Sequence, residues 1–595
     1  MKLTKRKALL LILVSVLLFA CDRKEKEEIQ PKVTAPEPPK SVTLLDVVPA
    51  DTIFFSGGLQ PFPLKEILQW EADTFNAFKG LDPKSLFPEM QEKETFWQRM
   101  GTELWLSYSA LLLSPEAELK KWGIQEKTFS ASYTVGLAPV FRISLQDVTA
   151  FENKLDELEA KVKITHTSET LGQATYRRYA LKKSASVDLI IGVDNKRKQA
   201  VVMLDLGVDS EQTLAIALGQ QKPEKTLADS GRVEALQKQY NLHPAHIGYI
   251  DHQQLITGLT TKEGNSVAKM LQSLASQLHL GVSAVLNELQ TDGCRHDLEA
   301  IGKNWPQTVF GYTTLDLTAS PSRIDSLLVL ENKDKALLES LQSLRGFIPQ
   351  YANTNNTAEQ PVVAGGIGLN VEKIAPFLTQ RWAAITQKEY KCSFLKDIQK
   401  DIKSQQPMAL AMMTGMAPGV QGLAFSLMSL ELEGKKNDPP LPKSMDALIS
   451  LAVKNPTVFI QTVSALFPPL AQLELSADGT PVQLPIPFPL PFPVMAAIHG
   501  SHVTVYTGEK SKALSQSLRS DSLDTPSGLL ATHLDYGKYY GLIGDALQSV
   551  DIPEAQQAET KALFEAMKGV TLPMQVNMDV TDRGLEIALD MTTTD

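Results

Sequence analysis

The chain has 595 residues, which is more than one hydrophobic core usually serves, so two or more domains are expected. Hydrophobic residues make up 43% of the chain and charged residues 21%, a balance that is typical of globular proteins. The formal net charge of −10 gives an acidic surface that repels phosphate backbones, which argues against a nucleic-acid partner.

The first twenty residues have the features of a secretory signal. Four basic residues precede Ala8–Ala20, a run of thirteen residues that are apolar except for Ser15. A basic head, a short apolar stretch and a small residue before the cleavage point are typical of signal peptides. Thirteen residues are too few for a membrane-spanning helix, which needs about 20. Residues 1–20 are therefore predicted to be a signal peptide.

The end of this run, Leu18-Phe19-Ala20-Cys21, resembles the lipobox of bacterial lipoproteins. The resemblance implies that Cys21 is acylated, with chains such as palmitate holding the protein on a membrane. Asp22 resembles the signal that retains enterobacterial lipoproteins in the inner membrane. This implies an inner-membrane anchor with the body in the periplasm, and the outer membrane is the alternative. A plain signal peptide with an incidental cysteine is the other interpretation.

Residues 21–42 are predicted to be the lipidated cysteine and a disordered linker. Asp22–Lys40 contains five acidic residues, five basic residues and four prolines, a composition that cannot bury a core. A flexible coil of this length reaches roughly 25 Å, which keeps the body close to the membrane. Residues 1–20 carry four of the 58 basic side chains and none of the 68 acidic ones. The remainder has a formal charge of −14, so attachment depends on acyl chains and not on a basic patch.

Two distant stretches of the body share one plan. Val47–Gly58 has the pattern of a turn, a strand and a Gly-Gly exit, and a helix is predicted near residues 63–70. Pro361–Gly368 repeats the strand and the Gly-Gly pair, 308 residues later, and a helix is predicted at 371–379. Both Gly-Gly pairs are interpreted as turn glycines.

Further pairs follow in the same order. Phe141–Leu145 leads into a helix that is predicted to open with a Thr149–Glu152 capping box, and in the second half Phe425–Leu430 precedes Ser444–Ile449. Each half is also predicted to close with a helix and a hairpin. The predicted closing helices span 295–303 and 556–568, and the strands span 307–316, 323–331, 572–580 and 583–590.

These pairs predict an α+β protein with two similar tandem domains, whose antiparallel sheets are packed by amphipathic helices. Copy one spans residues 43–335 and copy two spans 361–592, with a linker at 336–360. The alternative is one long α+β chain with recurring strand–turn–helix units. The opening strand, Pro49-Ala50-Asp51-Thr52 followed by aromatic residues, resembles a family of uncharacterised exported bacterial proteins. That resemblance implies no activity.

After Cys21 only Cys294 and Cys392 remain. An exported chain meets an oxidising compartment, and a metal site would want four ligands, so a disulfide is predicted. Two buried, unpaired thiols are the alternative. A bridge would join the end of copy one to the early part of copy two.

No sequence motif for catalysis or for nucleotide binding is present. The densest histidine clusters are His243–His252 and His499–His502. Metal binding needs three or four ligands that converge in space, so both are interpreted as polar strand or turn residues, and no metal or cofactor is predicted.

The most unusual run alternates apolar residues with five prolines. Proline excludes a helix, so the run is predicted to be extended, as polyproline II or as an edge strand. Its apolar residues face one way and either seal the core of copy two or form an exposed rim for a partner or an acyl chain. These residues are Leu484, Ile486, Phe488, Leu490, Phe492 and Val494.

Three classes of function remain open. The preferred hypothesis is a non-enzymatic envelope protein that binds a protein or lipid, or acts as a scaffold. The second is a carrier or chaperone for lipids or lipoproteins that uses an apolar sheet face. The third is a hydrolase with scattered catalytic residues. A continuous apolar groove would favour the carrier, and a pocket of converging polar groups would favour the enzyme.

Overall fold

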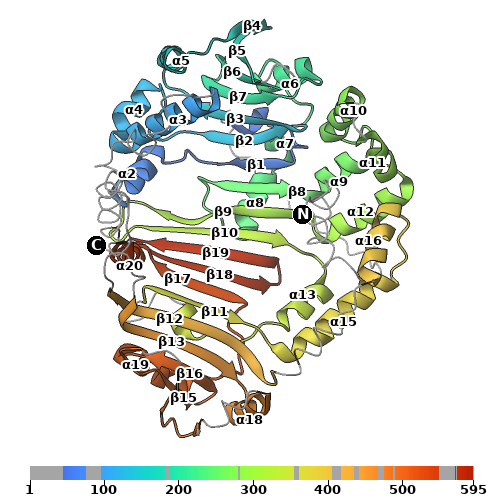
Figure 1. Cartoon of the computed structure of the whole chain (residues 1–595). Helices are drawn as coiled ribbons and strands as arrows, with labels where there is room; N and C mark the ends of the chain where they lie inside the picture. Colours follow the sequence, from blue (N-terminus) through green and yellow to red (C-terminus); the bar gives the residue numbers. More distant parts are fainter. Residues whose placement is uncertain are drawn as a thin grey trace.

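A computed structural model describes residues 44–74, 96–181, 187–278, 282–353, 361–404, 414, 417–433, 441–466, 473, 475–486, 490–547, 570 and 572–593. The chain is an α+β protein with 41% helix and 32% strand. Its strands form one antiparallel sheet of 19 strands, flanked by helices (Figure 1). The predicted class and the antiparallel pairing are confirmed. The strands form one sheet and not two, because β10 (Arg323–Glu331) pairs with β19 (Gly584–Thr592).

The β10–β19 pair divides the sheet into two halves. All strands of the first half of the chain lie on one side of it, and all strands of the second half lie on the other. From one edge the order is β4-β5-β6-β7-β3-β2-β1-β8-β9-β10, and it continues as β19-β18-β17-β11-β12-β13-β16-β15-β14. The other strands are β1 (Phe54–Gly57), β2 (Ser130–Val135), β3 (Ala138–Ser144), β4 (Thr167–Leu171), β5 (Ala174–Ala180), β6 (Asp188–Asp194), β7 (Gln199–Asp205), β8 (Ile247–Asp251), β9 (Gln307–Asp316), β11 (Val363–Gly368), β12 (Val420–Glu433), β13 (Leu441–Val453), β14 (Val482–Gln483), β15 (Met495–His499), β16 (His502–Thr507), β17 (Leu530–Asp535) and β18 (Pro573–Thr581).

The helices gather at the two ends of the strands and on one face of the sheet, and α5 covers part of the other face in the first half. In Figure 1, α2, α4 and α20 lie at one side of the sheet, and α9, α12, α13, α15 and α16 lie at the opposite side. The helices are η1 (Leu44–Val47), α2 (Leu64–Thr74), α3 (Phe96–Leu113), α4 (Pro115–Lys121), α5 (Val148–Val162), α6 (Ser210–Ala217), α7 (Leu227–Ser230), α8 (Arg232–Tyr240), α9 (His252–Thr260), α10 (Ser266–Leu278), α11 (Val282–Leu289), α12 (Asp292–Asn304), α13 (Lys335–Gln342), α14 (Gln350–Asn353), α15 (Val371–Gln387), α16 (Ser393–Lys403), α18 (Pro456–Leu466), α19 (Glu509–Ser517), η5 (Leu518–Ser520) and α20 (Tyr536–Leu547).

The largest core lies between the strands of the first half and the segments η1, α6, α7 and α8. Alternate residues of each strand enter it, as Phe55 of β1, Tyr133 of β2 and Tyr249 of β8 show. A second core lies under α14 and α19 and includes Tyr351 and Leu448. Helices α13 and α14 pack the segment 336–353 into the fold, because Leu337 of α13 and Tyr351 of α14 are buried.

A third core combines residues from both halves. Leu298 and Trp305 of the first half pack with Ile385 and Leu395 of the second half. Four helices supply most of this core, namely α12, α13, α15 and α16. Because its residues come from both sides of the β10–β19 junction, this core and the sheet together make the halves one packed body.

The structure corrects two local predictions. The helix after β3 begins with Asp147 as its N-cap, since its carboxylate accepts a hydrogen bond from the backbone N–H of Ala150, and not with a capping box at Thr149. Ser444–Ile449 is part of strand β13, which pairs with β12, so this segment is not a counterpart of the helix that follows Phe141–Leu145. The predicted closing hairpins coincide with β9–β10 and β18–β19 to within two residues. The predicted helix at 556–568 lies outside the described residues.

Candidate functional site

The outward face of β12 is apolar. Ala424 and Ser426 are buried, whereas Leu423 and Phe425, which alternate with them, are 51% and 46% exposed. An antiparallel sheet with one solvated face usually alternates apolar side chains inward with polar ones outward. In residues 423–426 of β12 both sets are apolar or small, and the larger side chains point away from the core.

The register extends this pattern over the neighbouring strands. Leu423 lies opposite Ile367 of β11 and Leu451 of β13, and Phe425 lies opposite Ile449 of β13. Ile367 and Ile449 are each 52% exposed. The four exposed side chains of Ile367, Leu423, Phe425 and Ile449 are contiguous, because paired residues on neighbouring strands share one face of a sheet. We call these four residues the apolar patch.

The apolar patch belongs to a longer row. We followed the paired residues from each strand to the next, over β13, β12, β11, β17, β18, β19, β10 and β9. The residue at this position is apolar in all eight strands. Eight strands at about 4.8 Å spacing give the row a length of roughly 34 Å. All eight side chains are at least partly exposed. The row, which we call the apolar row, consists of Leu451, Leu423, Ile367, Leu530, Met578, Ile587, Leu328 and Phe310.

Gly365 explains how the phenyl ring of Phe425 lies against the sheet. These two residues are directly opposite, and a Cβ on Gly365 would stand 2.9 Å from the ring carbon Cε1 of Phe425. The glycine therefore leaves room for the aromatic ring of the neighbouring strand. Gly365 and Gly366 lie within β11, so the interpretation of this pair as turn glycines is wrong.

Helices border the apolar patch at both ends of its strands. α20 contacts β12 and β17, and α15 contacts β12; Figure 1 places these helices on opposite sides of the sheet. The start of α20 carries an aromatic cluster in which the rings of Tyr536 and Tyr540 have centroids 4.5 Å apart, and Tyr539 packs edge-on against Tyr540. Tyr539 is partly exposed at this border.

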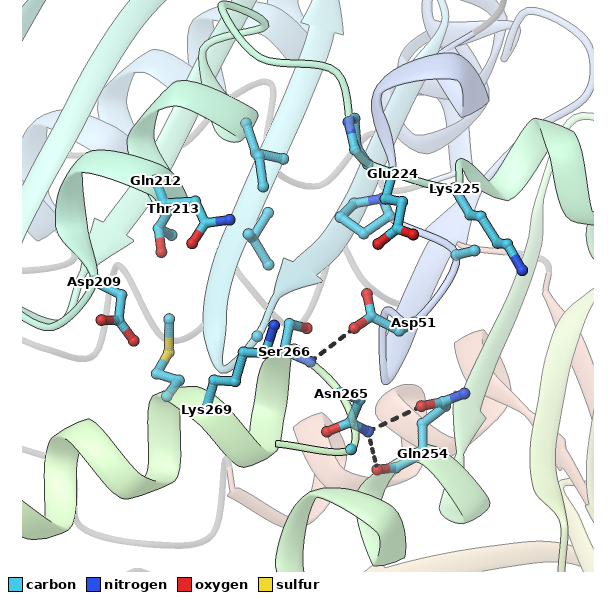
Figure 2. Close-up of a pocket in the computed structure, with 18 of the residues that line it drawn as sticks. Asp51, Asp209, Gln212, Thr213, Glu224, Lys225, Gln254, Asn265, Ser266 and Lys269 are labelled. Atoms are coloured by element: carbon cyan, nitrogen blue, oxygen red, sulfur yellow. Dashed lines mark hydrogen bonds between the residues drawn. The ribbon is translucent and has the colours of Figure 1, made fainter. Parts of the chain in front are cut away.

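A polar pocket of 540 Å³ lies elsewhere, between the turn before β1, α6 and α10 (Figure 2). The carboxylate of Asp51 accepts a hydrogen bond from the backbone N–H of Ser266 at 2.8 Å, at the N-terminus of α10. Asn265 donates to the backbone oxygen and to the side chain of Gln254 at 2.7 and 2.9 Å. These polar groups hold three segments of the chain together.

The same contacts give the Pro-Ala-Asp-Thr motif a structural role. Asp51 caps α10, as just described, and Thr52 is buried against β2. The hydroxyl of Thr52 lies 3.1 Å from that of Thr134 and also accepts the backbone N–H of Thr134 at 3.0 Å. The motif therefore connects the first strand to its neighbour and to a helix.

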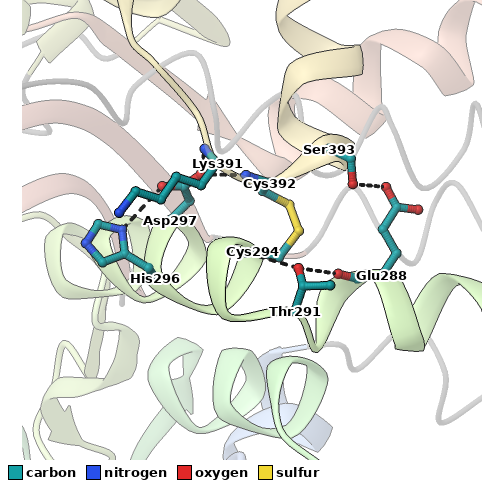
Figure 3. The surroundings of a disulfide bond; sticks show 8 residues. All are labelled: Glu288, Thr291, Cys294, His296, Asp297, Lys391, Cys392 and Ser393. Carbon is teal, nitrogen blue, oxygen red and sulfur yellow. Dashed lines mark hydrogen bonds and ion pairs between the residues drawn. A yellow bond between two sulfur atoms is a disulfide. The ribbon is translucent and has the colours of Figure 1, made fainter.

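Cys294 and Cys392 form a disulfide, which joins α12 to the segment before α16 (Figure 3). Both cysteines are buried in the core shared by the two halves. The carboxylate of Asp297 accepts the backbone N–H groups of Lys391 and Cys392 at 2.6 and 2.9 Å, and Ser393 donates to Glu288 at 2.6 Å. The bridge and the hydrogen bonds of Asp297 fix α16 against α12, and the bond from Ser393 to Glu288 connects α16 to α11.

The histidines that the structure describes do not come together as a metal site. Within the part of the chain that the structure describes, no three His, Cys, Asp or Glu side chains could hold a metal ion. His246 is 3.0 Å from the hydroxyl of Ser56, and His252 bonds the backbone oxygen of Trp305. His499 and His502 face each other across the β15–β16 hairpin, and burial lowers the pKa of His502 to about 4.

The proline run forms the end of a hairpin. The backbone N–H of Leu484 donates to the oxygen of Val494 at 2.8 Å, so the chain reverses within the run and the prediction of one extended strand is wrong. The alternation holds for the described part: Leu484, Ile486, Leu490, Phe492 and Val494 are partly buried, whereas Pro485, Pro491 and Pro493 are exposed. Phe488 lies outside the described residues. This hairpin forms the outer edge of the sheet at β14.

The predicted anchor lies outside the described residues. This applies to the signal peptide 1–20, to Cys21 and Asp22, and to the linker up to residue 42. Among the residues that are described, no helix has the length and apolar character needed to cross a membrane.

Comparison of the chain with models of known protein families, with curated proteins and with solved structures gave no match. Sequence reasoning placed the candidate contact surface on the proline run and missed the apolar patch. The available signal was Leu423–Leu427, an uncharged stretch in which larger apolar residues alternate with small ones.

Proposed function

We propose that this chain is an exported, lipid-anchored binding protein of the cell envelope, and that the apolar patch is its binding surface. The observation that carries the proposal is the exposure of four contiguous apolar side chains on a sheet whose other face is already buried. Large contiguous apolar patches are rare on soluble monomers and mark interaction sites. Covering them with a partner would stabilise the complex by about 25 cal/mol per Å² of apolar surface.

The two halves of the sheet support an internal duplication, with copy one at 43–335 and copy two at 361–592. Counted outward from the β10–β19 junction, the strands of copy one follow the order 10-9-8-1-2-3-7-6-5, and those of copy two follow 19-18-17-11-12-13-16-15-14. When β4 is left out, strands at the same distance from the junction also have the same sequential position within their own half of the chain. β4 of copy one has no counterpart among the described strands.

The duplication makes Leu423 and Phe425 of the apolar patch distinctive, whereas Ile449 of β13 has an exposed apolar counterpart in Phe141 of β3. β2 is the counterpart of β12, and it has Ser130 and Ser132 on its outward face where β12 has Leu423 and Phe425. In copy one, α5 also covers part of this face, since Phe151 and Leu155 pack against Ile143 and Ile191. The fold therefore does not require outward apolar residues at these positions, and their presence in copy two supports binding.

The location is part of the same proposal. An acylated Cys21 followed by Asp22 would hold the protein on the inner membrane, with the body in the periplasm. The buried disulfide is in keeping with an oxidising compartment. The outer membrane remains the alternative, and fractionation of membranes distinguishes the two.

The binding proposal is tested by replacing Leu423 and Phe425 of copy two with serine, the residue at the corresponding positions of copy one. In the full-length chain, Leu423→Ser with Phe425→Ser should retain the melting temperature, because both side chains are exposed. After crosslinking in intact cells, the species that copurify with the wild type should be lost. Val458→Ser is the matched control, because Val458 on α18 is 47% exposed and lies outside the apolar patch. Retention of every partner by the double variant, or no crosslinked species with the wild type, would overturn the proposal.

A further inference from the structure

We infer that the ligand of the apolar patch is an acyl chain of a membrane lipid, lying along the apolar row. The inference rests on the proposed function and names the chemistry of its partner. Four features of the chain favour this ligand over a protein: the absence of charge along the row, the pairing of its backbone, its length and its connection to a membrane.

The chemistry of the row matches a ligand without polar groups. All eight of its side chains are aliphatic, thioether or phenyl groups, and the neighbouring positions on β12 and β13 are Phe425 and Ile449. β11 is paired on both sides, with β12 and with β17, so its backbone groups are already bonded. A partner strand cannot add there, and only side-chain contacts are offered. A hydrocarbon chain makes these contacts without burying an unpaired polar group of its own.

The dimensions also agree. One leaflet of a bilayer core is about 15 Å thick, half of a total of about 30 Å, which sets the length of an acyl chain. The row is roughly 34 Å long, so it accommodates one acyl chain over half its length or two chains end to end. Three methionines lie on this face, Met578 in the row and the paired Met574 and Met591 four residues further along β18 and β19. Methionine side chains adapt their shape easily, which suits a flexible ligand.

The predicted lipid anchor at Cys21 and the linker after it would keep the protein close to a membrane, which is a source of lipid. The described chain begins at Leu44, and the predicted acylated Cys21 precedes it by 23 residues. Such a linker keeps the body within roughly 25–30 Å of the bilayer. Tyr539 and its neighbours on α20 border the face, and tyrosine favours places where an apolar region meets water. A lipid from the same membrane is therefore the nearest apolar ligand, and the net negative charge of the protein favours a headgroup that is not anionic.

The test places a photoreactive p-benzoylphenylalanine at position 425 of the full-length chain in its own cells. After irradiation, the peptide that contains residue 425 should carry the mass of an acyl-bearing lipid. The same probe at position 458 should carry none. Leu423→Ser with Ile449→Ser, combined with the probe, should lower the yield about tenfold, because two apolar contacts are removed.

The other outcomes separate the two proposals. An adduct with another protein, with a second copy of this chain or with its own acylated Cys21 peptide would overturn the lipid inference and keep the patch as a binding surface. No adduct above the level at position 458 would overturn the binding surface itself.

Discussion

Leu327 of β10 lies directly opposite Ala588 of β19, at the centre of the nine residue pairs that join the two halves of the sheet. This antiparallel contact and the core shared by α12 and α16 couple the halves. We therefore predict that the protein unfolds in a single cooperative transition. Calorimetry should give a calorimetric enthalpy equal to the van't Hoff enthalpy. Two resolved transitions would show that the halves are independent domains.

The disulfide should stabilise the protein, and in the folded state it should not exchange with external thiols, because both cysteines are buried. Cys294 and Cys392 are buried and separated by 98 residues, so in the chain-entropy model the bridge contributes about 4–5 kcal/mol. Cys294→Ser with Cys392→Ser should lower the free energy of unfolding by about this amount, as measured in urea. Thiol labelling of the unfolded, unreduced chain should find neither cysteine free. Two labelled thiols per chain would refute the bridge.

Asp297 should be needed for the junction between α12 and α16. Its carboxylate accepts two backbone N–H groups, and the Asp297→Ala substitution leaves both without this acceptor. We predict a loss of about 2–3 kcal/mol in the free energy of unfolding. Asp292→Ala is the control on the same helix, because Asp292 is exposed and should cost less than about 1 kcal/mol. Equal effects of the two substitutions would contradict this role of Asp297.

The fully buried Arg142 should be intolerant of replacement by an apolar residue. Its guanidinium donates to Asp194, to Gln199 at 2.5 Å and to the backbone oxygen of Ala217 at 2.6 Å. Arg142→Met removes these donors and should lower the free energy of unfolding by about 3–5 kcal/mol. The exposed pair of Arg295 with Asp292 provides the comparison, and Arg295→Met should change stability by less than about 1 kcal/mol. A neutral Arg142→Met would show that the buried network is dispensable.

Stability should fall below pH 6.5 because of His502. Burial lowers its pKa to about 4, so in this range the unfolded chain takes up a proton that the folded chain does not. The free energy of unfolding should decrease by about 3 kcal/mol as the pH falls from 6.5 to 4. His499 acts in the same direction, since burial and the charge of Arg519 lower its pKa.

Asp521 opposes this effect, because burial raises the pKa of its carboxyl group, 3.9 Å from the His502 ring. His502→Gln isolates the contribution of the imidazole. Its denaturation midpoint should depend less on pH between 4 and 6.5 than that of the wild type. An unchanged pH profile would show that His502 does not titrate abnormally.

The sequence by itself predicted the features that depend on local patterns. The closing hairpins were predicted from period-two stretches at 307–316 and 323–331 and from their counterparts near the C-terminus. This was possible because alternation, turn residues and strand length are local properties of the sequence. Cysteine count and compartment predicted the Cys294–Cys392 pairing. Only the tertiary structure decided that β10 pairs with β19 in one sheet, since long-range register leaves little trace in either strand.

The apolar patch shows the same limit. In Leu423-Ala424-Phe425-Ser426 the sequence indicates two faces, and the larger side chains would be expected to enter the core. The structure places Ala424 and Ser426 there, because α14 and α19 already fill the inward face with side chains such as Tyr351. Which face of a strand is buried depends on what packs against it, and that is decided by segments far away in the chain.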